Sequence, residues 1–149
     1  MKSSLQQSGM VEFVFSYLEN RTNETSSTRV TTLYYPIPNL KDNSLTLNSY
    51  QVRIDSSLYR HNKIEKVLKG PTKEALSEGA INIFPLNTTL IGLTVSNQVA
   101  YINFSKEFLD KNEWDEDLFY RTRIINETLK SDNDIKKVII LIEKEILDY

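Results

Sequence analysis

The side chains most able to do chemistry in this chain are four closely spaced carboxylates. Glu113, Asp115, Glu116 and Asp117 could act as a paired acid and base, or bind Ca²⁺. A calcium loop, however, needs oxygen ligands at alternating positions and a glycine at its turn, and this segment has neither. Acidic residues are favourable at the positive end of a helix dipole. We therefore predict that the cluster opens a helix, and we keep an enzyme that uses it as a third hypothesis.

The single histidine, His61, has no obvious catalytic or metal-binding partner in the sequence. The chain contains no cysteine, which excludes disulfides, thiol catalysis and thiolate metal sites. His61 lies between Leu58 and Ile64 on the apolar stripe of an expected helix, where a packed or rim histidine is the simpler interpretation. No Gly-x-Ser-x-Gly, phosphate-binding glycine loop or His-Glu-x-x-His occurs. We predict no enzyme activity, no catalytic residues, no cofactor and no metal site.

The composition predicts one domain without a strong electrostatic field. The chain has 149 residues, 40% of them hydrophobic, and 18 basic against 20 acidic side chains. Nucleic-acid binders usually carry a basic excess, so we expect no nucleic-acid partner. No apolar run is long enough to span a bilayer, and we expect membrane attachment only through an anchor absent from this chain. We expect residues 1–10 to be disordered or foreign to the natural chain, and residues 11–149 to form the domain.

Hydrophobic periodicity predicts a mixture of strands and helices. Residues 55–57 offer N-cap acceptors for a helix that should run to about Lys69 and be closed by Gly70. Its apolar face should contain Leu58, His61, Ile64, Val67 and Leu68. A second helix, opened by the acidic cluster, should bury a stripe that runs from Trp114 to Leu129. Asn97 tolerates the positive φ of a tight turn, whereas Gln98 makes a two-residue turn less favourable than glycine would. Strands are expected at residues 11–18, 29–35, 50–54, 81–84, 91–95, 100–104 and 138–142.

These elements predict an α+β fold. Each helix has an apolar stripe only one face wide, so both helices must lie on a sheet. We expect a two-layer sandwich, with a mixed or antiparallel sheet covered on one face by two main helices. An extra strand or hairpin is expected near the N-terminus, with residues 20–49 as an insertion.

Several motifs occur in an order that resembles the GerMN domain of bacterial sporulation and germination proteins. The resemblance covers roughly residues 50–145 and implies a fold similar to ring-building domains. It implies structural roles for Leu68, Gly70, Pro71, Thr72, Pro85, Tyr101, Asn103 and Phe104. The motifs are Val67-Leu68-Lys69-Gly70-Pro71-Thr72, then Pro85, then Tyr101-Ile102-Asn103-Phe104-Ser105 and Lys137-Val138-Ile139-Ile140-Leu141-Ile142.

The resemblance implies a non-enzymatic protein-interaction module outside the cytoplasm. Such modules are often lipoproteins or membrane-anchored, so we expect an extracytoplasmic location and a protein partner in the cell envelope. A homo-oligomer is a further option. The alternative function is a ligand-binding domain for cell-wall peptidoglycan fragments. The family also occurs in bacteria that do not sporulate, so sporulation itself is not implied.

One segment outside the resemblance is a candidate partner contact. Tyr34, Tyr35, Pro36 and Ile37 place two aromatic rings beside a proline, and tyrosine is enriched at protein interfaces. Two interpretations stay open. The segment is either an exposed adhesive patch, or its rings pack back over the sheet, which is the more frequent fate of large aromatic side chains.

Overall fold

A mixed sheet of four strands forms one layer of the molecule, with the strand order β3-β4-β5-β6. The computed structural model describes residues 27–111 and 116–148. β3 and β4 run antiparallel, β4 and β5 parallel, and β5 and β6 antiparallel. Along the chain the elements are β1 (Thr28–Pro38), β2 (Leu45–Asp55), α1 (Tyr59–Leu68), α2 (Lys73–Ser77), β3 (Leu90–Ser96), β4 (Val99–Phe104), the 3₁₀ helix η1 (Lys106–Leu109), α3 (Asp117–Lys130), β5 (Lys137–Ile142) and β6 (Glu145–Ile146).

The chain divides into two compact units. The larger consists of residues 30–52 and 60–149, and the smaller of residues 1–29 and 53–59. In the described part of the smaller unit, the Ser56 N–H donates to the Ser27 carbonyl at 3.0 Å. The Arg29 guanidinium lies 3.7 Å from the ring centroid of Tyr59, which is a cation–π contact. The sheet, the core and the contacts described below all belong to the larger unit.

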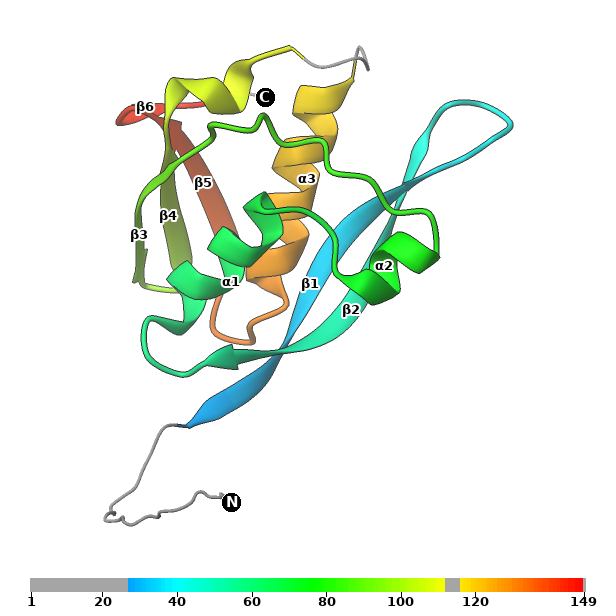
Figure 1. Cartoon of the computed structure of the whole chain (residues 1–149). Helices are drawn as coiled ribbons and strands as arrows, with labels where there is room; N and C mark the ends of the chain where they lie inside the picture. Colours follow the sequence, from blue (N-terminus) through cyan, green and yellow to red (C-terminus); the bar gives the residue numbers. More distant parts are fainter. Residues whose placement is uncertain (1–26, 112–115, 149) are drawn as a thin grey trace. The chain divides into compact units, whose positions relative to one another are not determined.

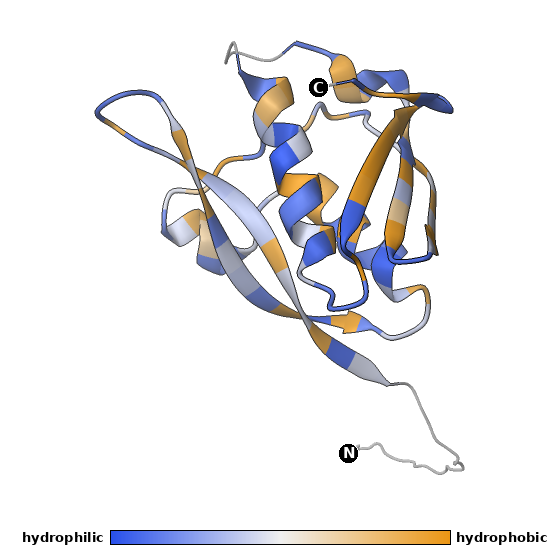
Figure 2. Cartoon of the chain, turned by 180° about the vertical axis from the view of Figure 1, so that it is seen from behind, coloured by the Kyte–Doolittle hydropathy of each residue, from blue (hydrophilic) through white to orange (hydrophobic). Residues whose placement is uncertain are grey.

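The core lies on one face of the four-stranded sheet. Side chains alternate between the faces of a strand, so every second residue of β4 and β5 points inward. These inward residues are Ala100, Ile102, Phe104, Val138 and Ile140, and all are buried. Figure 2 shows that β5 is hydrophobic for most of its length.

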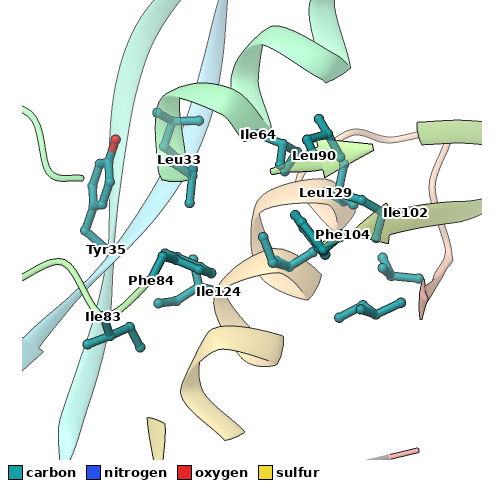
Figure 3. Packing of buried hydrophobic residues seen from close by; sticks show 14 of the residues in the cluster. Leu33, Tyr35, Ile64, Ile83, Phe84, Leu90, Ile102, Phe104, Ile124 and Leu129 are labelled. Carbon is teal, nitrogen blue, oxygen red and sulfur yellow. The ribbon is translucent and has the colours of Figure 1, made fainter. Parts of the chain in front are cut away.

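Two helices supply the other side of this core. α1 contributes Ile64 and Val67, and α3 contributes Ile124, Ile125 and Leu129. Ile64, Leu129, Phe104 and their neighbours pack closely in Figure 3. The predicted α+β class is confirmed, because amphipathic helices cover one face of a mixed sheet.

The N-terminal hairpin forms a sheet of its own. β1 and β2 pair only with each other among the described strands. Within the larger unit, α3 lies between β5 and the hairpin (Figure 1). Leu33, Tyr35, Leu45 and Tyr50 of the hairpin join the same core cluster as the four-stranded sheet. The extra hairpin expected near the N-terminus is therefore present.

Three details differ from the sequence predictions. Leu58 is not part of the buried stripe, because it precedes α1 with φ 50° and its side chain is 73% exposed. α3 begins at Asp117, later than the acidic cluster suggested. Residues 81–84 are not a strand: the Ile81 N–H reaches the Pro36 carbonyl, but no continuous ladder follows. The predicted strand at residues 11–18, like Trp114, lies outside the described residues.

Candidate functional site

The hairpin of β3 and β4 closes through a two-residue turn with left-handed backbone. Asn97 has φ 51° and Gln98 has φ 66°, and the flanking residues Ser96 and Val99 are paired. Positive φ at both central positions is the mark of a type I′ turn, whose twist suits a hairpin. The turn therefore forms even though Gln98 occupies a position that glycine would fill more easily.

The register of this hairpin determines which backbone groups of β3 point away from β4. In an antiparallel pair, successive residues alternate between bonding the neighbour and facing the opposite edge. The carbonyl oxygens of Gln98 and Phe104 accept bonds from the β5 side, from Lys136 N at 2.7 Å and Glu143 N at 2.9 Å. The even-numbered residues of β4 thus face β5, and the odd-numbered residues face β3.

It follows that Leu93 and Val95 direct their backbone groups toward the open edge of β3. They lie opposite Ile102 and Ala100, the residues of β4 whose backbone groups face β5. No strand in residues 27–111 and 116–148 pairs with this outer edge. Each exposed pair of N–H and C=O groups is a potential partner for another extended chain.

β3 carries only one of the features that usually protect a strand edge, a bulge at its start. Proteins commonly block such edges with charged side chains, proline or very short strands. Residues 90–96 read Leu-Ile-Gly-Leu-Thr-Val-Ser, with no charge and no proline. A bulge between Leu90 and Gly92 interrupts the ladder only at the start of the strand. The opposite edge of the sheet differs, because β6 is two residues long and contains Glu145.

The outer face of the sheet adds apolar surface beside this edge. Tyr101 is 41% exposed and lies opposite Ile139 in the parallel pair of β4 and β5. Leu141 lies opposite Ile146, which is 71% exposed. Ile139 and Leu141 are half-buried. This face is less covered than the inner face, where the corresponding residues of β4 have no exposure.

The outer edge of β1, by contrast, is closed by other parts of the larger unit. The Tyr34 N–H donates to the Thr128 hydroxyl at 3.3 Å. The Pro36 carbonyl accepts from Ile81 N at 3.0 Å, and Ser131 Oγ lies 3.5 Å from the Thr32 carbonyl. The hydroxyls of Thr128 and Ser131 and the amide of Ile81 therefore occupy positions that a neighbouring strand would otherwise take.

The predicted adhesive patch is mostly turned inward. Tyr35 is 2% exposed, Pro36 is buried, and the Tyr35 ring lies 5.9 Å from that of Tyr50. An exposed patch formed by all four residues is therefore wrong, because Tyr35 faces the core and Pro36 beside it is buried as well. Only Tyr34 and Ile37, both half-buried, keep part of their surface accessible. Whether they contact a partner stays a prediction.

Burial also alters the acidity of the two tyrosines. It raises the pKa of Tyr35 to about 12. The Tyr35 hydroxyl has no hydrogen-bond partner among the described residues. Burial likewise raises the pKa of Tyr50, and its hydroxyl donates to Glu78 Oε1 at 2.6 Å. Within the described residues, the hairpin thus buries one phenol with a hydrogen-bond partner and one without.

The first family motif forms a helix end followed by a helix start. Leu68 is half-buried at the end of α1, and Gly70 adopts φ 107°, which L side chains rarely accept. Pro71 follows, and the Thr72 hydroxyl accepts a bond from Ala75 N at 3.2 Å as the N-cap of α2. Gly70 and Thr72 thus shape the local backbone.

The later motif residues hold β4 and its flanking turns. The Pro85 carbonyl accepts from Thr88 N at 3.0 Å. Asn103 Oδ1 accepts from Lys144 N at 2.9 Å, which fixes the turn between β5 and β6. Phe104 has no exposure and stacks on Phe108 with ring centroids 4.6 Å apart.

Of the residues that first suggested chemistry, the structure describes Glu116, Asp117 and His61. Glu113 and Asp115 lie outside the described residues. Glu116 precedes α3, while Asp117 is its first residue and is 3% exposed, with Oδ2 at 3.6 Å from Arg121 Nη2. His61 is half-buried on α1. Among the described residues, no group of three or more His, Cys, Asp or Glu side chains is placed to hold a metal ion.

Two buried cations were not predicted from the sequence. Arg121 is 1% exposed, and it donates to the carbonyls of Ile83 at 2.7 Å, Phe108 at 2.8 Å and Asp110 at 2.7 Å. Burial lowers its pKa, an effect that Asp117 opposes. The guanidinium thereby supplies these three carbonyls with the hydrogen-bond donors that a helix or strand would otherwise provide.

The second buried cation, Lys63, has no exposure and contacts Ser131 and Asp132. Helical spacing was the available signal for both residues. Lys63 lies four residues before Val67, and Arg121 lies four residues before Ile125, so each shares a face with a core residue.

Comparison with protein families identifies the fold. A family described as "Germane: Sporulation and spore germination" matches residues 32–148. The chain belongs to the Germane family. The match begins within residues 20–49, the range expected to be an insertion. No match is found among curated proteins. None of the helices in the described part of this Germane chain is long and apolar enough to cross a membrane.

Solved structures show the same Germane fold at low identity. The first GerMN domain of the sporulation protein GerM from Bacillus subtilis superposes with a TM-score of 0.62 at 23% identity, covering 80% of this chain and 86% of that one. The tandem GerMN domains of the same protein give 0.62 and 23%, and cover 79% of this chain. The present chain spans only 40% of that tandem structure. A candidate lipoprotein from Clostridium perfringens gives 0.53 at 20%, covering 81% and 78%.

Proposed function

We propose that this chain is a non-enzymatic protein-interaction module of the bacterial cell envelope, located outside the cytoplasm. Membership of the Germane family supports this proposal. So does the similarity in fold to a sporulation protein and to a candidate lipoprotein. A lipid or membrane anchor outside this sequence would tether the module, and its partner would be a protein of the cell envelope.

The observation that carries the proposal is the outer edge of β3, with which no strand in the described part of the chain pairs. The outer edge of β1 is closed by contacts with Thr128, Ser131 and Ile81. The outer edge of β3, in contrast, presents the backbone groups of Leu93 and Val95. An extended segment of a partner can add to such an edge, with main-chain hydrogen bonds supplying affinity and side-chain contacts supplying specificity. The outer face around Tyr101 would then supply apolar contacts to the partner's side chains.

The buried charges of the core support a role without catalysis. Lys63 contacts Asp132, and Arg121 holds three backbone carbonyls. Both cations make structural contacts and lie in the interior, so they are poorly placed to reach a substrate. What the fold exposes instead is hydrogen-bonding backbone, which is the chemistry of recognition.

Affinity capture from envelope extracts tests the proposal. Val95→Pro removes the outward N–H of β3 without removing a bond to β4, and proline is tolerated at such edge positions. Val95→Ala is the matched control, because it shortens the same half-buried side chain but keeps the N–H. We expect Val95→Ala to retain the partner captured by the wild type and Val95→Pro to lose it.

Equal capture by the two variants, with both folded by circular dichroism, would contradict the role of the edge. Absence of any specific partner for the wild type would contradict the proposed function itself. A separate Tyr34→Ala variant tests the accessible part of the Tyr34–Ile37 segment. If only the Tyr34→Ala variant loses the partner, the contact lies on the hairpin of β1 and β2 and not on the edge of β3.

A further inference from the structure

We propose that the edge of β3 pairs with the same edge of a second copy of this chain. The two strands would run antiparallel across a two-fold axis at Thr94, and would join two four-stranded sheets into one. This inference rests on the proposed function, in which β3 binds an extended polypeptide. It identifies that polypeptide as β3 of a second copy.

The positions of the free backbone groups fit a two-fold axis. Leu93 and Val95, which face the open edge, lie one residue on either side of Thr94. A two-fold axis at Thr94 therefore places Leu93 opposite Val95 of the second copy, and Val95 opposite its Leu93. Each of these pairs can exchange both N–H···O bonds, as in an ordinary antiparallel ladder. An isologous interface requires this self-complementarity.

The side chains of β3 also permit a copy of the strand to approach. Like charges directly opposite each other destabilise a strand pair. From Leu90 to Ser96 there is no charged residue, so the two paired β3 strands would not place like charges opposite each other. β6 could not pair in this way, because it has only two residues and one of them is Glu145.

The contact should be weak in solution. Stable interfaces bury on the order of 1,000 Å² or more in total, and a single short strand pair buries less. We therefore expect a dimer that forms at high protein concentration and is strengthened when both copies are confined to one surface. The experiment must for this reason trap the dimer or use concentrated protein.

Single cysteines give a specific trap, because the natural sequence contains none. In the proposed dimer Thr94 faces its own copy at a non-hydrogen-bonded position, where Cα atoms are about 4.5 Å apart. Disulfides need Cα atoms within roughly 4.4–6.8 Å, so Thr94→Cys should cross-link under mild oxidation. Ser96→Cys is the matched control, because it is also exposed on β3 but would lie about 13 Å from its own copy.

We expect Thr94→Cys to form disulfide-linked dimer at least about tenfold faster than Ser96→Cys. Sedimentation equilibrium of the cysteine-free chain at high concentration should show a dimer for the wild type and for Val95→Ala, and none for Val95→Pro. Equal cross-linking of the two cysteine variants, or dimerisation that Val95→Pro leaves intact, would overturn the second copy as the partner. If that outcome is found but capture from envelope extracts still requires the Val95 N–H, the proposed function stands. The strand that pairs with β3 would then come from another protein.

Discussion

The Lys63 ammonium nitrogen lies 3.3 Å from Oδ1 of Asp132, and the two side chains are 0% and 8% exposed. Lys63 also donates to Ser131 Oγ at 3.1 Å, and Arg60 Nε lies 3.3 Å from the other oxygen of Asp132. This network ties α1 to the end of α3. Removing one partner of a buried ion pair leaves the other charge uncompensated in a low-dielectric interior.

Asp132→Asn should destabilise the fold more than Lys63→Met does. Asp132→Asn removes the carboxylate charge beside the buried Lys63, and we expect a loss of about 3 kcal/mol in the free energy of unfolding. Lys63→Met fills a similar volume, and Asp132 keeps Arg60, so a loss of about 1 kcal/mol is expected. Urea unfolding measures both. A larger loss for Lys63→Met would show that Arg60 does not compensate Asp132.

Thr128→Val should weaken the closed edge of β1. Valine matches threonine in shape but cannot accept the bond from the Tyr34 N–H, which would remain without that acceptor. Thr128 is fully buried, so we expect a loss of about 1–2 kcal/mol and faster hydrogen exchange at the Tyr34 amide. Thr94→Val, on an exposed site, is the control and should change stability by less than about 0.5 kcal/mol. An unchanged Tyr34 exchange rate would argue against this closure.

Tyr35→Phe should leave the fold intact at neutral pH and stabilise it at alkaline pH. The Tyr35 pKa is raised to about 12 from 10.0 by burial. Below pH 10 the phenol is neutral in both the folded and unfolded states. Above it the unfolded state ionises first, so stability falls as the pH rises from 10 to 12. The loss is of the order of 2 kcal/mol.

Chemical unfolding at pH 7 and pH 11 compares the wild type with Tyr35→Phe. The variant should equal or exceed the wild type at pH 7, because it removes a buried hydroxyl without a hydrogen-bond partner among the described residues. It should lose less stability at pH 11. The same alkaline loss in both proteins would mean that Tyr35 does not cause it.

Gly70→Ala should be costly, whereas Gly92→Ala should be tolerated. At Gly70 φ is +107°, and an added Cβ would lie 3.3 Å from Asn82 Nδ2. We expect a loss of about 1–3 kcal/mol from backbone strain. At Gly92 nothing lies within 4 Å of an added Cβ. Thermal unfolding of both variants checks this, and similar melting temperatures would contradict it.

Local signals in the sequence predicted most of the fold. Gly70 and Pro71 marked the end of α1, alternation located β3 and β4, and a continuous apolar run located β5. One failure arises from contacts that the local sequence does not show. Residues 81–84 were read as a strand from their composition, but their backbone groups are satisfied by contacts distant in sequence, including Arg121.

The candidate site was harder to predict for the same reason. Tyr34 and Tyr35 alternate between the faces of β1, and the sequence does not say which face α3 covers. The open edge of β3 is a property of strand order, which depends on how β4 pairs with β5. Its lack of charge is visible in the sequence, but it becomes meaningful only once the strand is known to lie at an edge.

Hydrogen exchange at the amides of Leu93 and Val95 tests the central claim most directly. In the isolated chain at low micromolar concentration, both should exchange at least about tenfold faster than the amide of Thr94, which bonds to β4. Adding the envelope protein captured by the wild type, or concentrating the chain itself, should slow both amides. Slow exchange in the isolated chain, or exchange that no partner alters, would contradict an open edge that receives another polypeptide.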